Sequence, residues 1–190
     1  MAELAYAHDS GSCPGSRVWV QVPSTALIIL DPCIYMGLFC WEAVMEVYYK
    51  KMLALAETIA VEAHKGQFDK GGHPYINHPR FVSAHCTSPE AKIVGMLHDV
   101  IEDTDVTLDM LKEYGFNDNI LTALDLVTKK KGPDYDEDIY YEKIKANPVA
   151  REVKLADLTH NSDISRIPNP TEKNIQKTEY YKSRIKFLEH

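Results

Sequence analysis

Apolar residues recur along most of this chain at the three-and-four spacing of an amphipathic helix. The first such stripe holds Tyr48, Met52, Leu55 and Ile59. The same spacing continues to the C-terminal end, and no alternation of apolar and polar residues indicates a strand. The pattern predicts an all-α helical bundle from Met45 onward.

Several residues in this pattern are typical of helix starts. Ser88 is expected to cap a helix with Pro89 in its first turn, and Ile93, Leu97 and Ile101 on its buried face. Further helices are expected to begin with Pro79 in the first turn, after Thr107, after Asn117, at Pro148 and after about Thr171.

The composition changes near residue 45. The first 44 residues hold three of the four cysteines and no lysine, and they show no sustained period. We expect residues 1–44 to be an appendage with little structure of its own, or a misassigned start with the natural product beginning at Met36 or Met45. Residues 45–190 are expected to form one domain. The cysteines lack zinc-site or disulfide spacing, which favours a reducing, cytoplasmic environment.

Charge and hydropathy exclude two classes of partner. The formal net charge is -7, and no basic stripe offsets it, so no DNA or RNA partner is expected. The apolar run ALIILDPCIYMGLFCW is interrupted by Asp31 and Pro32 and is shorter than the about 20 residues of a spanning helix. We therefore expect no membrane segment. Oligomeric state is not indicated by any feature.

The stretch GMLHDVIEDT concentrates ionisable residues on an apolar helix. Residues His98, Asp99, Glu102 and Asp103 stand at i, i+1, i+4 and i+5, which places them on one edge of that helix. A lone His-Asp pair is weak, because most such pairs are surface or capping residues. Acidic groups facing a core, however, are destabilising unless a cation meets them.

Two other motifs supply matching groups. In GGHPYINHPR, His78 stands at a helix start, whereas His73 precedes a proline and is expected to be an exposed turn residue. In KLADLTHN, residues Lys154, Asp157 and Asn161 form one helical stripe. His160 lies off that stripe and is expected to be a core histidine or to support a ligand.

Two imidazoles and two carboxylates without a thiolate suit a divalent transition metal with open positions, such as Mn²⁺, Fe²⁺ or Zn²⁺. Such an ion lowers the pKa of bound water and stabilises charge on a phosphoryl oxygen. Glu102 and Asp103 are placed to orient or deprotonate that water.

The ordered motifs AHKGQ, KGGHPYINHP, HDVIEDT and KLADLTHN resemble the HD superfamily, specifically the hydrolase domain of RelA/SpoT-type alarmone enzymes and their small stand-alone relatives. The resemblance covers the chain from about Met45 to the C-terminus. It implies an all-helical HD fold and a Mn²⁺-dependent pyrophosphohydrolase that removes the 3′-diphosphate of (p)ppGpp. Since the chain leaves no room for a synthetase domain, hydrolysis alone is expected.

Carried over by position, the resemblance implies roles for individual residues. The metal ligands would be His78, His98, Asp99 and Asp157. The catalytic acidic pair would be Glu102 and Asp103. The substrate-binding residues would be Lys70, Tyr75, Lys154 and Asn161, with Arg166 as a further source of positive charge.

Two departures bear on specificity. Asp69 stands where the long alarmone enzymes carry an arginine, which removes a bidentate phosphate contact. Ile164 stands where they have a polar residue that contacts the base. Both changes leave open another phosphorylated nucleotide as substrate, such as NADPH, or a catalytically silent nucleotide-binding regulatory module. A metal-free helical bundle is the least favoured alternative, because it leaves several buried ionisable residues without partners.

Overall fold

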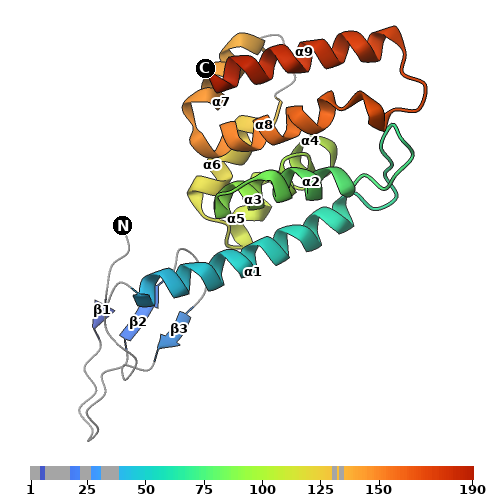
Figure 1. Ribbon diagram of the computed structural model, residues 1–190. Coiled ribbons are helices and arrows are strands. Elements are labelled where there is room, and N and C mark those ends of the chain that lie inside the picture. The colour runs from blue at the N-terminus through green and yellow to red at the C-terminus, as the bar shows by residue number, and fades with distance from the viewer. Residues whose placement is uncertain (1–4, 7–17, 22–26, 31–38, 130–131, 133–134) are drawn as a thin grey trace, which may run out of the picture.

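The computed structural model of the protein describes residues 5–6, 18–21, 27–30, 39–129, 132 and 135–190 (Figure 1). The described strands are β1 (Ala5–Tyr6), β2 (Val18–Gln21) and β3 (Leu27–Leu30). The described helices are α1 (Phe39–Ala63), α2 (Asn77–His85), α3 (Pro89–Leu97), α4 (Val100–Asp103), α5 (Leu108–Glu113), α6 (Asp118–Val127), α7 (Glu137–Ala146), α8 (Pro148–Ser162), the 3-10 helix η1 (Ile164–Arg166) and α9 (Glu172–Glu189).

The three strands form a small antiparallel sheet in the order β1-β2-β3, with Val18 opposite Leu30. They fall within residues 1–44, for which no strand pattern is apparent in the sequence. Most of that segment, including Cys13 and Cys33, lies outside the described residues. Helix α1 begins before residue 45 and runs across it, and the division of the chain into two parts stays a prediction.

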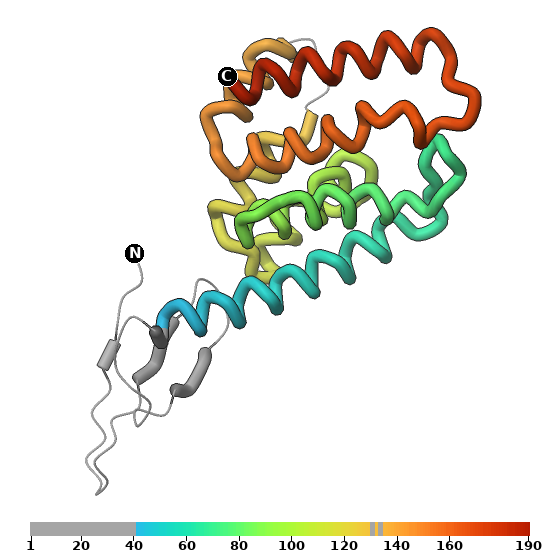
Figure 2. Tube along the Cα trace, viewed as in Figure 1, coloured from blue at the N-terminus to red at the C-terminus, as the bar shows by residue number. Residues whose placement is uncertain are grey.

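The expected all-α bundle is confirmed for the chain from α1 onward. The described residues there form helices and their connections, with one isolated bridge between Phe68 and Pro74. Helix α3 packs against α1, α2, α6 and α8, and α9 packs on α8. Figure 2 shows the resulting stack of α1, α3, α8 and α9. None of the helices in this part of the chain is both long and apolar enough to cross a bilayer.

The helix starts agree with the sequence signals. The Ser88 hydroxyl accepts a hydrogen bond from the amide of Ala91, and Pro89 follows in the first turn. This cap satisfies an amide that the helix itself leaves unpaired, as do the caps of the helices that follow. The other expected starts are also found: Thr107 caps α5, Asn117 caps α6, Asn147 precedes Pro148 of α8, and Thr171 forms a capping box with Asn174 at α9.

One expected helix is interrupted. The stretch from Pro89 to beyond Ile101 is not one helix, because α3 ends at Leu97 and α4 begins at Val100. The ring Nδ1 of His98 lies 2.8 Å from the carbonyl oxygen of Gly95, which the amide of the next residue would use in a continuous helix. Ile101, expected on the buried face, is half-buried after this break.

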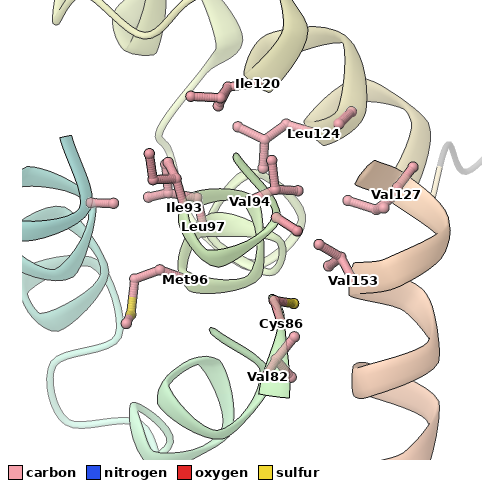
Figure 3. Packing of buried hydrophobic residues seen from close by; sticks show 14 of the residues in the cluster. Val82, Cys86, Ile93, Val94, Met96, Leu97, Ile120, Leu124, Val127 and Val153 are labelled. Atoms are coloured by element: carbon pink, nitrogen blue, oxygen red, sulfur yellow. The ribbon is translucent and has the colours of Figure 1, made fainter. Parts of the chain in front are cut away.

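The core is centred on α3 (Figure 3). Its apolar side chains meet residues from the helices around it: Ile93, Val94 and Leu97 pack with Ile120 and Leu124 of α6, Val153 of α8 and Val82 of α2. On α1 the buried stripe continues from Tyr48 and Met52 through two alanines, Ala56 and Ala60, while Leu55 and Ile59 are half-buried at its edge. The small alanines are consistent with the close packing of α1 on α3.

Replacing Ile93 by alanine should destabilise the fold. Its side chain is fully buried, and a large-to-small change in a packed core costs about 2–5 kcal/mol. The matched control is Ile139→Ala, at a side chain that is 54% exposed, which should change the free energy of unfolding by less than about 0.5 kcal/mol. Urea unfolding followed by circular dichroism measures both, and equal losses would contradict this description of the core.

Candidate metal centre

Two histidines and two aspartates from neighbouring helices converge in the bundle. The His98 Nε2 lies 3.2 Å from His78 Nε2 and 3.1 Å from Asp99 Oδ2. His78 Nε2 in turn lies 3.3 Å from Asp99 Oδ2 and 3.3 Å from Asp157 Oδ1. His78 is on α2, Asp157 is on α8, and the other two residues fill the break between α3 and α4. These four residues, here called the HHDD cluster, are the ones that the sequence predicts as ligands.

The cluster is largely shielded from water. His78, His98 and Asp157 are buried, and each offers a ligand atom within 4.8 Å of the others. The side chain of Asp99 is 18% exposed. The protein therefore encloses three of the four residues and leaves part of the fourth, Asp99, accessible to solvent.

Hydrogen bonds behind the imidazoles fix which ring nitrogen faces the cluster. Since the Gly95 carbonyl can only accept, the His98 Nδ1 carries the proton that it donates there, 2.8 Å away. The Nε2 of His98 is therefore the nitrogen available as a ligand. A hydrogen bond of this type is the usual outer partner of a metal-binding histidine.

His78 is held in the same way by His160. Their Nδ1 atoms lie 2.6 Å apart, and the Arg166 Nη1 lies 2.9 Å from the same His160 nitrogen. Arginine can only donate, so the His160 Nδ1 is an acceptor, and its single lone pair is shared between the Arg166 guanidinium and the proton on the His78 Nδ1. Burial, His78 and Arg166 lower the pKa of His160 to about 4, which keeps this acceptor neutral. As expected, His160 supports the cluster from behind.

The carboxylates are ionised in this setting. Burial raises the pKa of Asp99, but the imidazoles of His98 and His78 outweigh it and hold that pKa well below its usual range. For Asp157, burial likewise opposes ionisation, and Lys154 together with the two imidazoles lowers the pKa. Burial lowers the pKa of His78, yet hydrogen bonds to Asp157 and Asp99 raise it to about 9. The two carboxylates therefore attract positive charge to this point.

The donor set fits a divalent metal ion. Ligand atoms about 2.1 Å from one ion lie roughly 3.0–3.5 Å from each other, and the separations of 3.1, 3.2 and 3.3 Å agree with that. A fifth pair, His98 Nε2 and Asp157 Oδ1, is 3.9 Å apart, as ligands at a wider angle would be. Imidazole nitrogen with carboxylate oxygen is the chemistry of Mn²⁺, Fe²⁺ and Zn²⁺ sites with open positions.

Three of the predicted substrate-binding residues bond to the cluster carboxylates. The Tyr75 hydroxyl donates to Asp99 Oδ2 over 2.7 Å. The buried Lys154 ammonium donates to Asp157 Oδ2 over 2.8 Å, and the Asn161 amide donates to Asp157 Oδ1. Lys154, Asp157 and Asn161 therefore lie along one stripe of α8, as predicted, and the Lys154 ammonium balances the charge of the Asp157 carboxylate.

Glu102 and Asp103 lie on α4, directly after the cluster. Glu102 is half-buried and accepts a hydrogen bond from the amide of Lys129 over 3.3 Å. Asp103 is exposed. Because the helix breaks at His98 and Asp99, these residues and the acidic pair do not share one edge of a continuous helix as the spacing predicts, and the catalytic role of the acidic pair stays a prediction.

The glycine-rich loop after α1 is joined to Arg166 through Asp69. Its Oδ1 accepts from the amides of Gly71 and His73, each over 2.9 Å. Its Oδ2 lies 3.0 Å from the Arg166 Nη2. The acidic residue that departs from the alarmone enzymes is thus neutralised inside the protein. His73, whose side chain is 71% exposed, is the turn residue expected.

A pocket of about 380 Å³ opens beside the cluster between this loop and α9. Figure 1 shows the loop and the connection from α8 to α9 at the same end of the bundle. The lining of the pocket includes four residues that are predicted to bind substrate, Lys70, Tyr75, Asn161 and Arg166, together with His78. That volume lies in the range of small-molecule sites. Lys154 is held at Asp157, behind the cluster.

Sequence reasoning missed the wall that α9 contributes. Lys177, Asn174, Thr178 and Tyr181 line the pocket, as does Phe68, which is 67% exposed. Burial, Lys177 and Lys173 all lower the pKa of Lys70, so positive charge gathers at the pocket. No local signal marks these α9 residues, because their position depends on how α9 packs on α8.

Known proteins similar to this chain are found both by sequence and by fold. No family model matches the chain. The chain is 34% identical over 149 residues to a guanosine-3′,5′-bis(diphosphate) 3′-pyrophosphohydrolase of Borreliella burgdorferi. This match covers 68% of the chain and 21% of that protein. The chain is also 35% identical over 116 residues to a Haemophilus influenzae protein of the same name, covering 54% of this chain and 17% of that protein. The chain spans about a fifth of the length of these relatives, or less.

The fold has a similar solved structure, described as a metazoan ortholog of SpoT that hydrolyses ppGpp. The TM-score is 0.59, the sequence identity is 22%, and the match covers 72% of this chain and 84% of that chain. This likeness concerns the fold. Taken with the sequence relatives, it shows that the helical part of the chain is similar in sequence and in fold to SpoT-type ppGpp hydrolases.

Removing Lys154 should cost far more stability than removing a similar surface lysine. Lys154→Met leaves the buried Asp157 carboxylate without its ammonium partner, which costs about 3–5 kcal/mol. The control is Lys182→Met, which breaks an exposed pair with Glu179 of the same spacing and the same 2.8 Å length and should cost about 0–1 kcal/mol. Urea unfolding in the presence of a chelator compares the two. Losses of equal size would show that the Asp157 charge is balanced elsewhere.

Proposed function

We propose that the protein is a metal-dependent phosphohydrolase that converts guanosine-3′,5′-bis(diphosphate) to GDP and pyrophosphate. The observation that carries this proposal is the HHDD cluster, in which His78, His98 and Asp157 offer ligand atoms within 4.8 Å of one another and Asp99 contacts both histidines. The cluster lies beside a pocket with basic residues in its wall. Support comes from the names of the sequence relatives, which are ppGpp 3′-pyrophosphohydrolases.

The ion proposed is Mn²⁺, with Fe²⁺ or Zn²⁺ as alternatives for the same ligands. His78, His98, Asp99 and Asp157 would hold it. When bound, such an ion supplies a water of lowered pKa and stabilises charge on a phosphoryl oxygen. Tyr75, Lys154 and Asn161 hold the ligand carboxylates in place through the hydrogen bonds that they donate.

The remaining chemistry is assigned to the chain's own residues. Glu102 and Asp103 would orient the attacking water and take its proton. The water oxygen bonds to the phosphorus next to the ribose, the bond from that phosphorus to the 3′ oxygen breaks, and the 3′ oxygen receives a proton. Lys70 and Lys177 at the pocket would attract the remaining phosphates, since each adds positive charge near the site.

A second candidate substrate is another phosphorylated nucleotide, such as NADPH, from which the 2′-phosphate would be removed. The observation that favours it is Asp69, which stands in place of the arginine of the long alarmone enzymes and is bonded to Arg166. The metal ligands and the acidic pair would serve either reaction. The choice between substrates depends on the pocket alone.

Purified protein with Mn²⁺ should release pyrophosphate from ppGpp, and Asp99→Ala should abolish both Mn²⁺ binding and turnover. The control is Asp105→Ala, at an exposed aspartate close by in the sequence, which should retain both. Release of phosphate from NADPH without turnover of ppGpp would transfer the proposal to the second candidate. Bound Mn²⁺ with no turnover of either would favour the silent regulatory module, and full activity of Asp99→Ala would refute the site.

Glu102→Gln separates metal binding from proton transfer. Because Glu102 lies on α4 outside the four ligands, the variant should bind Mn²⁺ as the unmodified protein does but lose about a hundredfold or more in turnover, the contribution typical of a general base. Isothermal titration with Mn²⁺ and single-turnover assays measure the two properties. Loss of Mn²⁺ binding in this variant would reassign Glu102 as a ligand.

A further inference from the structure

A chain of hydrogen bonds connects the glycine-rich loop to the back of His78. Asp69 Oδ2 accepts from Arg166 Nη2 over 3.0 Å. The Arg166 Nη1 donates to the His160 Nδ1 over 2.9 Å and to the His160 carbonyl oxygen over 3.0 Å. The same His160 nitrogen accepts from His78 Nδ1 over 2.6 Å. The chain begins at the pocket wall and ends at a predicted metal ligand.

Each member of this chain is held in place by other contacts. Asp69 is fixed to its own loop by the amides of Gly71 and His73. The His160 ring stacks on Phe81 with centroids 4.0 Å apart and lies nearly coplanar with the His78 ring, at an interplanar angle of 15°. The side chains of Asp69 and Arg166 are 13% and 27% exposed. The guanidinium is therefore a fixed and partly shielded part of the site.

The direction of these bonds matters for His78. Because arginine can only donate, the His160 Nδ1 carries no proton, and its one lone pair, shared with Arg166, accepts the Nδ1 proton of His78. The Nε2 of His78 is then the nitrogen that faces Asp99 and Asp157. Hydrogen-bond partners of this kind orient metal-binding histidines and raise metal affinity.

We propose that Asp69, Arg166 and His160 are positioning residues that hold His78 as a metal ligand. In this chain the aspartate that replaces a phosphate-binding arginine serves the metal site through Arg166. The inference rests on the proposed metal site and not on the identity of the substrate. It differs from the sequence expectation that Arg166 binds the substrate, because both of its terminal nitrogens already bond within the protein.

Mn²⁺ titration without substrate tests the proposal. Arg166→Met should weaken Mn²⁺ binding by about tenfold to a hundredfold, the range for outer partners of a metal-bound histidine, and Asp69→Asn should weaken it in the same direction. The matched control is Arg184→Met. Arg184 is also partly buried and bonds to two carboxylates, those of Glu137 and Asp138, and its loss should leave Mn²⁺ affinity unchanged.

A double-variant comparison tests the route through His160. His160→Phe keeps an aromatic ring next to Phe81 but removes the acceptor, so it should weaken Mn²⁺ binding about as much as Arg166→Met does. If the two act in one chain, the combined variant should be no weaker than either alone. Effects that multiply would show independent roles and overturn the route.

The outcomes also separate this inference from the proposed function. Unmodified protein that fails to bind Mn²⁺ would refute the metal site itself. Mn²⁺ affinity unchanged in Arg166→Met, with a raised KM for ppGpp, would refute the positioning role and return Arg166 to the substrate. Thermal unfolding of the chelated variants shows whether a variant has failed to fold, and Asp69→Asn then provides the same comparison with a smaller change.

Discussion

Two carboxylates, Asp99 and Asp157, lie beside two imidazoles in a nearly closed part of the helical bundle. Negative charge in such a place is destabilising unless positive groups and hydrogen-bond donors surround it. The surroundings here are arranged for that purpose, because Lys154 and Asn161 bond to one carboxylate and Tyr75 to the other. What remains is an attraction for a cation between the ligand atoms, and the proposed chemistry depends on it.

The bundle supplies this arrangement from a few local features. A break between α3 and α4 turns His98 and Asp99 toward the helices around them, and α8 brings Asp157 opposite. Helix α3 is packed on several sides, so its end is held firmly. A firmly held end is what a metal site needs, because ligand atoms have to stay within a few tenths of an ångström of a common centre.

The electrostatic effect of Asp69 on the site depends on its partner in the folded chain. Taken alone, an acidic residue near a polyanionic substrate is unfavourable, since it adds repulsion. Paired with Arg166 it is neutralised, and both residues lie in the pocket wall, where the guanidinium also bonds to His160 behind the metal site. Substrate preference then depends on the other residues of the pocket wall, among them Lys70, Lys177 and Phe68.

The sequence by itself determined the helices, most of their caps and the four cluster residues, because helical periodicity, capping and ordered motifs are local signals. The tertiary structure decided three things that no local signal carries. These are the break at His98, the pairing of Asp69 with Arg166, and the wall that α9 adds to the pocket. The physical reason is that each depends on contacts outside the regular helical pattern, which form only once the loops and helices have packed together.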